Sequence, residues 1–167
     1  MKNAITIYDK IKRLEKTCGK ISDICKILLS TDGSITSIFE VLKGDIEFKA
    51  LKQEFLKADA KIARLLGVAK GAAVNSRRVL MSKDGVHLMR ALSYTSADAA
   101  PDGFKEDLTA GNIAIGKILK KYNMETRREI LSVSLKKTEN LLRRKYRIIY
   151  GGKTLVYIEE EFFADNF

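Results

Sequence analysis

Two tight-turn signals, each set between apolar strand-like runs, constrain the fold of this chain more than any other feature. Asp-Gly and Gly-Gly pairs adopt the positive φ angles that two-residue hairpin turns require. Strands joined by hairpins form an antiparallel sheet, whereas a parallel sheet needs long helical crossovers. The two predicted hairpins pair 74–81 with 86–94 around Lys-Asp-Gly at 83–85, and 144–150 with 153–163 around Gly-Gly at 151–152.

Helical patterns surround these strands. An apolar stripe with alternating spacings of four and three residues runs from Ile7 to Leu28, which is typical of amphipathic helices, and Gly19 divides it into two. Shorter helices are expected at 58–66 and 113–122. We therefore expect an α+β fold class: a single domain over residues 1–167, mostly an antiparallel sheet flanked by helices, with N-terminal helices in 1–30 packed on it.

Several classes of protein are excluded by residue usage. The two cysteines cannot form a disulfide framework or a zinc site by themselves, and a single histidine argues against a His-dependent triad. No apolar stretch approaches the roughly 18 residues that span a bilayer, and the N-terminus becomes charged too early for a secretory signal. We expect a cytoplasmic protein with reduced thiols, no membrane partner and no metal.

Most of the net positive charge lies in one segment. The chain has 31 Lys and Arg against 21 Asp and Glu, a net charge of +10, and residues 112–153 carry 12 of the cations and 3 of the acids, 12 − 3 = +9. Such a segment attracts anions, from nucleic acid to a small polycarboxylate, unless it is only solvated surface. Nucleic acid is the less favoured partner, because no helix concentrates groove-reading side chains.

Two Arg-Arg pairs lie in strand-like segments, at Arg77-Arg78 and Arg127-Arg128. Neighbouring residues of a strand point to opposite faces, so at most one member of each pair points inward. Periodicity does not decide which one. An inward guanidinium needs an anionic partner, which is either a glutamate of the protein or the carboxylate of a bound ligand.

Three consecutive glutamates interrupt the apolar run at 155–163. Glu160 shares a strand face with Val156 and Ile158, while Glu159 and Glu161 share the other face. Whichever face is buried therefore contains a carboxylate. Among apolar side chains a carboxylate either pairs with an arginine or becomes a hydrogen-bonding or acid–base group.

The order of several fragments resembles the chorismate lyase family, including its small archaeal and actinobacterial members. The fragments are LLSTDGSIT at 28–36, SRRVLMSKDGV at 76–86, AIGKILKKYNMETRREI at 114–130 and KYRIIYGGKTLVYIEEEFF at 145–163. The family has proline where Ala114 stands, and usually also where Phe163 stands. The resemblance implies a chorismate lyase-like fold with a ligand enclosed beneath mobile flaps.

The resemblance also implies an activity and site residues. The expected reaction converts chorismate to 4-hydroxybenzoate and pyruvate, and it needs no cofactor because aromatisation drives it. The family's carboxylate-binding arginine corresponds to Arg77, its pocket glutamate to Glu159 and a second basic position to Arg127. Glu160 remains an alternative to Glu159, and Arg78 an alternative to Arg77, because the sequence does not decide which face of either strand points to the ligand. The alternative function is non-catalytic binding of a small aromatic acid, because the lyase fold resembles the UTRA effector domains of bacterial regulators.

Overall fold

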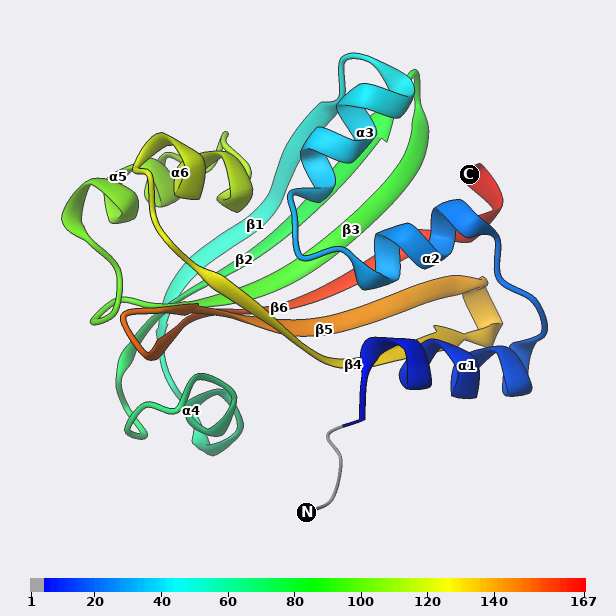
Figure 1. Ribbon diagram of the computed structural model, residues 1–167. Coiled ribbons are helices and arrows are strands. Elements are labelled where there is room, and N and C mark those ends of the chain that lie inside the picture. The colour runs from blue at the N-terminus through cyan, green and yellow to red at the C-terminus, as the bar shows by residue number, and fades with distance from the viewer. Residues whose placement is uncertain (1–4) are drawn as a thin grey trace.

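The computed structural model describes residues 5–167 as a six-stranded antiparallel sheet surrounded by six α-helices (Figure 1). The strand order is β1-β2-β3-β6-β5-β4, so that two three-stranded meanders meet where β3 pairs with β6. The strands are β1 Glu47–Lys57, β2 Ala73–Lys83, β3 Val86–Ser96, β4 Arg127–Lys136, β5 Leu141–Tyr150 and β6 Lys153–Phe163. The predicted α+β class with an antiparallel sheet is confirmed.

Both predicted hairpins are present. Asp84 and Gly85 connect β2 to β3 with φ angles of 49° and 77°, and Gly151 and Gly152 connect β5 to β6 with φ angles of 54° and 77°. Positive φ at both central residues is the turn geometry whose twist matches that of the flanking strands. The local chemistry of two dipeptides therefore determines the pairing of four of the six strands.

Side-chain caps mark where several helices begin. Thr6 and Asp9 form a reciprocal capping box at the start of α1, while Ser22, Ser34 and Asp59 accept hydrogen bonds from the first-turn amides of α2, α3 and α4. The helices are α1 Ile7–Cys18, α2 Asp23–Ser30, α3 Ile35–Lys43, α4 Ala60–Leu66, α5 Asp102–Ala110 and α6 Ile115–Lys121. Gly19 separates α1 from α2, as its position in the apolar stripe predicts.

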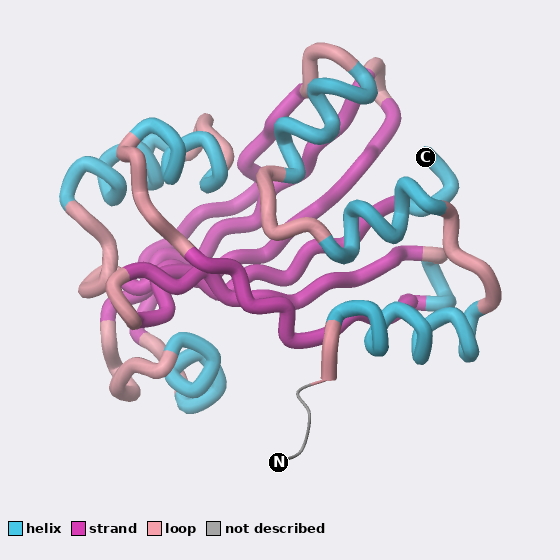
Figure 2. The backbone as a smooth tube through the Cα atoms, viewed as in Figure 1, coloured by secondary structure: helices cyan, strands magenta, loops and turns pink. Residues whose placement is uncertain are grey.

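The two faces of the sheet have different coverings (Figures 1 and 2). Helices α1, α2 and α3 share one core with β2, β3, β5 and β6, and α5 and α6 share a second core with β5 and β6. Helix α4 packs on the opposite face, against Val74 and Tyr157. No helix of the described residues 5–167 is long and apolar enough to cross a membrane.

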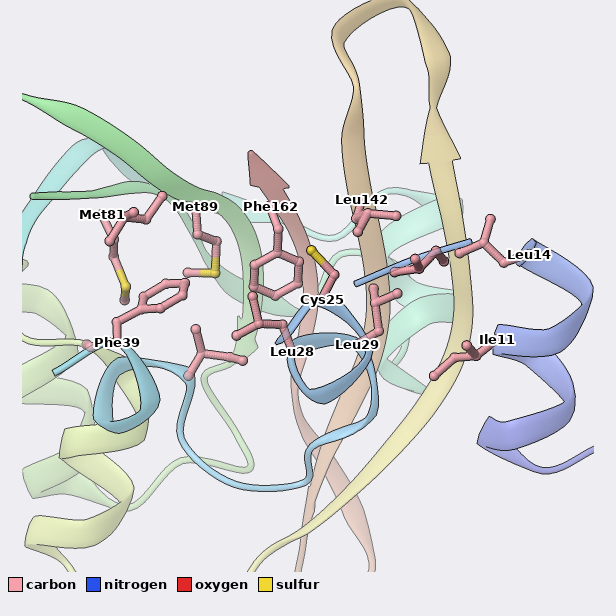
Figure 3. Packing of buried hydrophobic residues seen from close by; sticks show 14 residues of the cluster. Ile11, Leu14, Cys25, Leu28, Leu29, Phe39, Met81, Met89, Leu142 and Phe162 are labelled. Atoms are coloured by element: carbon pink, nitrogen blue, oxygen red, sulfur yellow. The ribbon is translucent and has the colours of Figure 1, made fainter. Parts of the chain in front are cut away.

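The larger core joins the N-terminal helices to the sheet (Figure 3). Leu28 and Leu29 of α2 and Phe39 of α3 are fully buried against Met89 and Phe162. Full burial of a side chain of this size stabilises the fold by roughly 1.5–3 kcal/mol. The core holds α2 and α3 over the sheet, and the loop between them reaches the pocket described next.

Candidate ligand-binding pocket

A pocket of about 60 Å³ lies between the helix-covered face of the sheet and the starts of α3 and α6. Its apolar wall includes Phe48, Met89 and Ile158. Charged groups also reach it from two separated strands, Arg77 from β2 and Arg128 from β4. A mostly apolar hollow with a few convergent polar groups is the usual form of a small-molecule site.

Arg77 is the most deeply buried charge of the pocket, with 1% of its surface exposed. Its Nη1 and Nη2 donate to the main-chain oxygens of Ile113 and Gly111 at 2.8 and 2.6 Å, and its guanidinium lies 5.0 Å from the ring centre of Phe48. The ion pairs formed within residues 5–167 do not include Arg77, and its Nε has no hydrogen-bond partner there. Burial lowers the pKa of Arg77 to about 10. A bound carboxylate would supply the missing counter-charge.

Arg128 provides a second guanidinium at the far side of the same pocket. It is half-buried, and its Nη1 donates to the main-chain oxygen of Asp32 at 2.5 Å. Across the described part of the chain, Arg128 also has no acidic partner within ion-pair distance. Four strand spacings separate β2 from β4, about 19 Å along the sheet, and both long side chains line the same pocket.

A buried carboxylate, Glu160, lines the pocket and already has its counter-charge. Arg144 Nε donates to Glu160 Oε2 at 2.9 Å, Arg144 Nη2 lies 2.6 Å from the same oxygen, and the Tyr146 hydroxyl donates to Oε1 at 2.8 Å. Glu160 is 5% exposed and Arg144 1%. Burial, with the nearby charge of Glu160, raises the pKa of Tyr146 well above its ordinary value, so this hydroxyl remains a donor. The carboxylate is fixed in position and in orientation.

Strand arginines hold the two loops over the pocket, and the helices that follow these loops approach each other. Arg144 Nη1 donates to Thr31 O at 2.7 Å, which holds the α2–α3 loop, as Arg77 holds the α5–α6 loop. A Cβ on Gly116 would lie 3.1 Å from Ser34 Oγ, so a side chain there would require the serine to shift by a few tenths of an ångström where α6 approaches α3. An exposed ion pair between Lys117 and Glu40, at 2.6 Å, also joins these helices.

The structure separates the residues that the sequence proposed for one site. Arg77 lies at the pocket, whereas Arg78 is exposed on the opposite face of the sheet. Glu159, the expected pocket glutamate, also lies on that opposite face, where it accepts a hydrogen bond from Tyr157 at 3.0 Å and pairs with Lys145 at 3.3 Å. The pairing of β3 with β6 assigns the pocket face to Glu160, so Glu160 replaces Glu159 as the pocket carboxylate.

The second basic position shows the same difference of one residue. Arg127 is exposed at the start of β4 and does not line the pocket, while its neighbour Arg128 does. Neighbouring side chains of β4 point to opposite faces of the sheet, so only one of these two arginines can point into the pocket.

Two residues of the site were not among the predicted ones. Arg144 and Tyr146 belong to a basic run that, read as a whole, resembles solvated surface. The usable signal is the alternation Leu142-x-Arg144-x-Tyr146-x-Ile148, because these four residues share the buried face of β5.

The antiparallel sheet with helices packed on both faces, and the charged pocket beside α3 and α6, define an α+β domain with a candidate ligand site. Solved structures with this fold include the effector domain of PhnF from Mycobacterium smegmatis, with a TM-score of 0.62 and 17% identity over 80% of this chain and 90% of that one. A GntR-family transcriptional regulator from Bacillus cereus gives a TM-score of 0.53 and 18% identity over 73% and 94%. At these identities the likeness concerns the fold alone.

Sequence comparison identifies the family. The model of the Rv2949c-like chorismate pyruvate-lyases matches residues 29–166, and the chain belongs to this family. A Methanocaldococcus jannaschii protein named "Putative lyase MJ0807" is 32% identical, over 93% of this chain and 86% of its own length. The chorismate pyruvate-lyase of Mycobacterium leprae is 24% identical, over 100% and 83%.

Proposed function

We propose that this protein is a lyase that converts chorismate to 4-hydroxybenzoate and pyruvate in the pocket between sheet and helices. The observation that carries the proposal is the pair of guanidiniums, Arg77 and Arg128, that reach one pocket without acidic partners among the described residues. Chorismate carries two carboxylates on one small ring system. A guanidinium fork matches a carboxylate in geometry as well as charge.

Each group of the site has a separate task in this proposal. Arg77 binds the ring carboxylate, and Arg128 binds the enolpyruvyl carboxylate and stabilises the negative charge that develops on the departing group. Glu160, held by Arg144 and Tyr146, accepts a hydrogen bond from the ring hydroxyl and fixes the ring in the reactive orientation.

The reaction is balanced without an external reagent. The bond between the ring and the enolpyruvyl oxygen breaks, and its electron pair leaves with that oxygen. The ring carbon that bears the hydroxyl loses its proton, and the electrons of that C–H bond complete the aromatic ring. The proton ends on the methylene carbon of the released group, which becomes pyruvate, while the ring becomes 4-hydroxybenzoate.

Ligand binding must widen the pocket, because 60 Å³ is smaller than the roughly 300–1,000 Å³ of ordinary ligand sites. Both guanidiniums now donate to main-chain oxygens of the covering loops, Arg77 to Gly111 and Ile113, and Arg128 to Asp32. Carboxylates of the ligand would take over these donors. The exchange releases the loops and gives the ligand room at the same step.

A second candidate function is the binding of a small aromatic acid without chemistry. The observation that favours it is the fold shared with the effector domain of PhnF and with a GntR-family transcriptional regulator. The same pocket and the same arginines would serve it, and the cytoplasmic location expected from the sequence suits both functions. Only turnover distinguishes the two.

The test is incubation of the purified protein with chorismate, with both products quantified. We expect 4-hydroxybenzoate and pyruvate in equal amounts, at least a tenfold lower kcat/KM for Glu160→Gln, and near-normal turnover for its matched neighbour Glu159→Gln. Circular dichroism confirms that both variants fold. A rise in melting temperature with chorismate but no product would support the binding protein instead. Loss of turnover in Glu159→Gln alone would contradict the assignment of the pocket face.

A further inference from the structure

A second, larger hollow runs between α1 and β4, and we call it the α1–β4 groove. Its volume is about 490 Å³. The helix contributes Lys10, Arg13, Leu14 and Thr17, which recur at the spacing of one helical face, and the strand contributes the consecutive residues 131–135. The groove is separate from the ligand pocket, which shares none of these residues.

The consecutive strand residues show that the groove follows the edge of the sheet. A hollow above one face of a strand would be lined by alternate residues, because neighbouring side chains point to opposite faces. β4 is the last strand in the order of the sheet, so among residues 5–167 only β5 pairs with it. Lys10 donates to Ile130 O at 2.5 Å, and within residues 5–167 no other hydrogen bond uses the outer edge of β4 between 130 and 135. The groove therefore presents unpaired amide and carbonyl groups, which another extended chain can pair with.

The charges of the groove are all positive. Lys10, Arg13 and Lys137 line it, no aspartate or glutamate does, and the ion pairs formed in the described part of the chain involve none of these three cations. A second copy of this chain would bring the same cations against them, so like-charge repulsion disfavours edge-to-edge self-association. Negative charge on the partner would instead be complementary.

We propose that the α1–β4 groove is a docking site for an extended acidic peptide segment of another protein, which adds to the sheet as a strand beside β4. Main-chain hydrogen bonds to the strand edge provide affinity, and contacts of acidic side chains with the α1 cations and Lys137 provide selectivity. Peptide is favoured over nucleic acid because the strand edge alternates donors and acceptors, and a phosphodiester backbone has no donor to offer its carbonyls.

The experiment measures fluorescence anisotropy of a labelled eight-residue peptide of alternating Glu and Val against the full chain. We expect 1:1 binding that weakens at least tenfold between 50 and 500 mM salt. Arg13→Glu and Lys137→Glu should each weaken it at least fivefold. Lys16→Glu, which makes the same charge change on α1 outside the groove, should change it less than twofold. If circular dichroism shows that Arg13→Glu lowers the helix content, Arg13→Gln replaces it as the test variant.

The same peptide with alternate amide nitrogens methylated keeps its charge but loses the donors needed for strand pairing. It should bind at least tenfold more weakly. Equal binding of the methylated peptide, equal weakening by Lys16→Glu, or no binding at millimolar peptide would each overturn the proposal. The proposal would also be overturned if oligothymidylate displaced the peptide and the binding of oligothymidylate itself depended on Arg13. The groove would then be a nucleic-acid site.

Discussion

Replacing Arg144 by methionine should strongly destabilise the protein. The substitution removes the only cation paired with Glu160 among the described residues and leaves the carboxylate, 5% exposed, with the Tyr146 hydroxyl as its remaining partner. Breaking a buried ion pair from one side costs about 3–5 kcal/mol. At about 2–4 °C per kcal/mol for a domain of this size, the melting temperature should fall by roughly 6–20 °C.

Urea denaturation followed by circular dichroism measures this loss as the change in the free energy of unfolding. Arg143→Met is the matched control, because Arg143 neighbours Arg144 on β5 but lies on the other face, where Arg90 still pairs with Glu161 after the change. We expect less than about 1 kcal/mol for this partly exposed pair. The double variant Arg144→Met/Glu160→Gln should recover much of the lost stability, since the uncompensated charge is gone. A single variant as stable as the wild type, or a double variant as unstable as the single one, would refute the reasoning.

Three further predictions concern the pocket and the pH dependence of stability. Arg77→Met should lower kcat/KM for chorismate about tenfold to two-hundredfold, the equivalent of roughly 1.5–3 kcal/mol for a charged hydrogen bond, while Arg78→Met stays within twofold. Arg128→Met should raise the Kd for the dianion at least tenfold in equilibrium titrations but leave product inhibition by the monoanion 4-hydroxybenzoate nearly unchanged. Burial raises the pKa of Glu161, but hydrogen bonds from two arginines outweigh it and lower the pKa below the ordinary 4.5. Its stabilisation is therefore present above that value and lost as the pH falls, so in urea titrations Glu161→Gln should be less stable than the wild type at pH 7 and approach it at pH 3.

The architecture was predictable because its main determinants are local. The Asp-Gly and Gly-Gly turns join strands that follow each other in the chain, and Gly19 interrupts an apolar stripe that continues on both sides. Neither inference needs knowledge of distant contacts. The start of β5 was predicted less accurately. The strand begins at Leu141, and the basic residues near its start do not have the apolar pattern of a strand.

The facing of the site residues was not predictable, for a physical reason. β2 has apolar residues on both faces, because Val79 and Met81 line the pocket side while Val74 packs against α4 on the other. β6 also has buried apolar residues on both faces at one of its ends. Which face of a strand is buried then depends on helices far away in the sequence, so Glu159 and Glu160 could not be distinguished by periodicity.

A crystal structure of the protein with 4-hydroxybenzoate tests the central assignment most directly. We expect the carboxylate of the product within hydrogen-bond distance of the Arg77 guanidinium, in place of at least one main-chain oxygen of the α5–α6 loop, and the phenol oxygen directed toward Glu160. Product bound on the opposite face of the sheet, beside Arg78 and Glu159, would contradict the account.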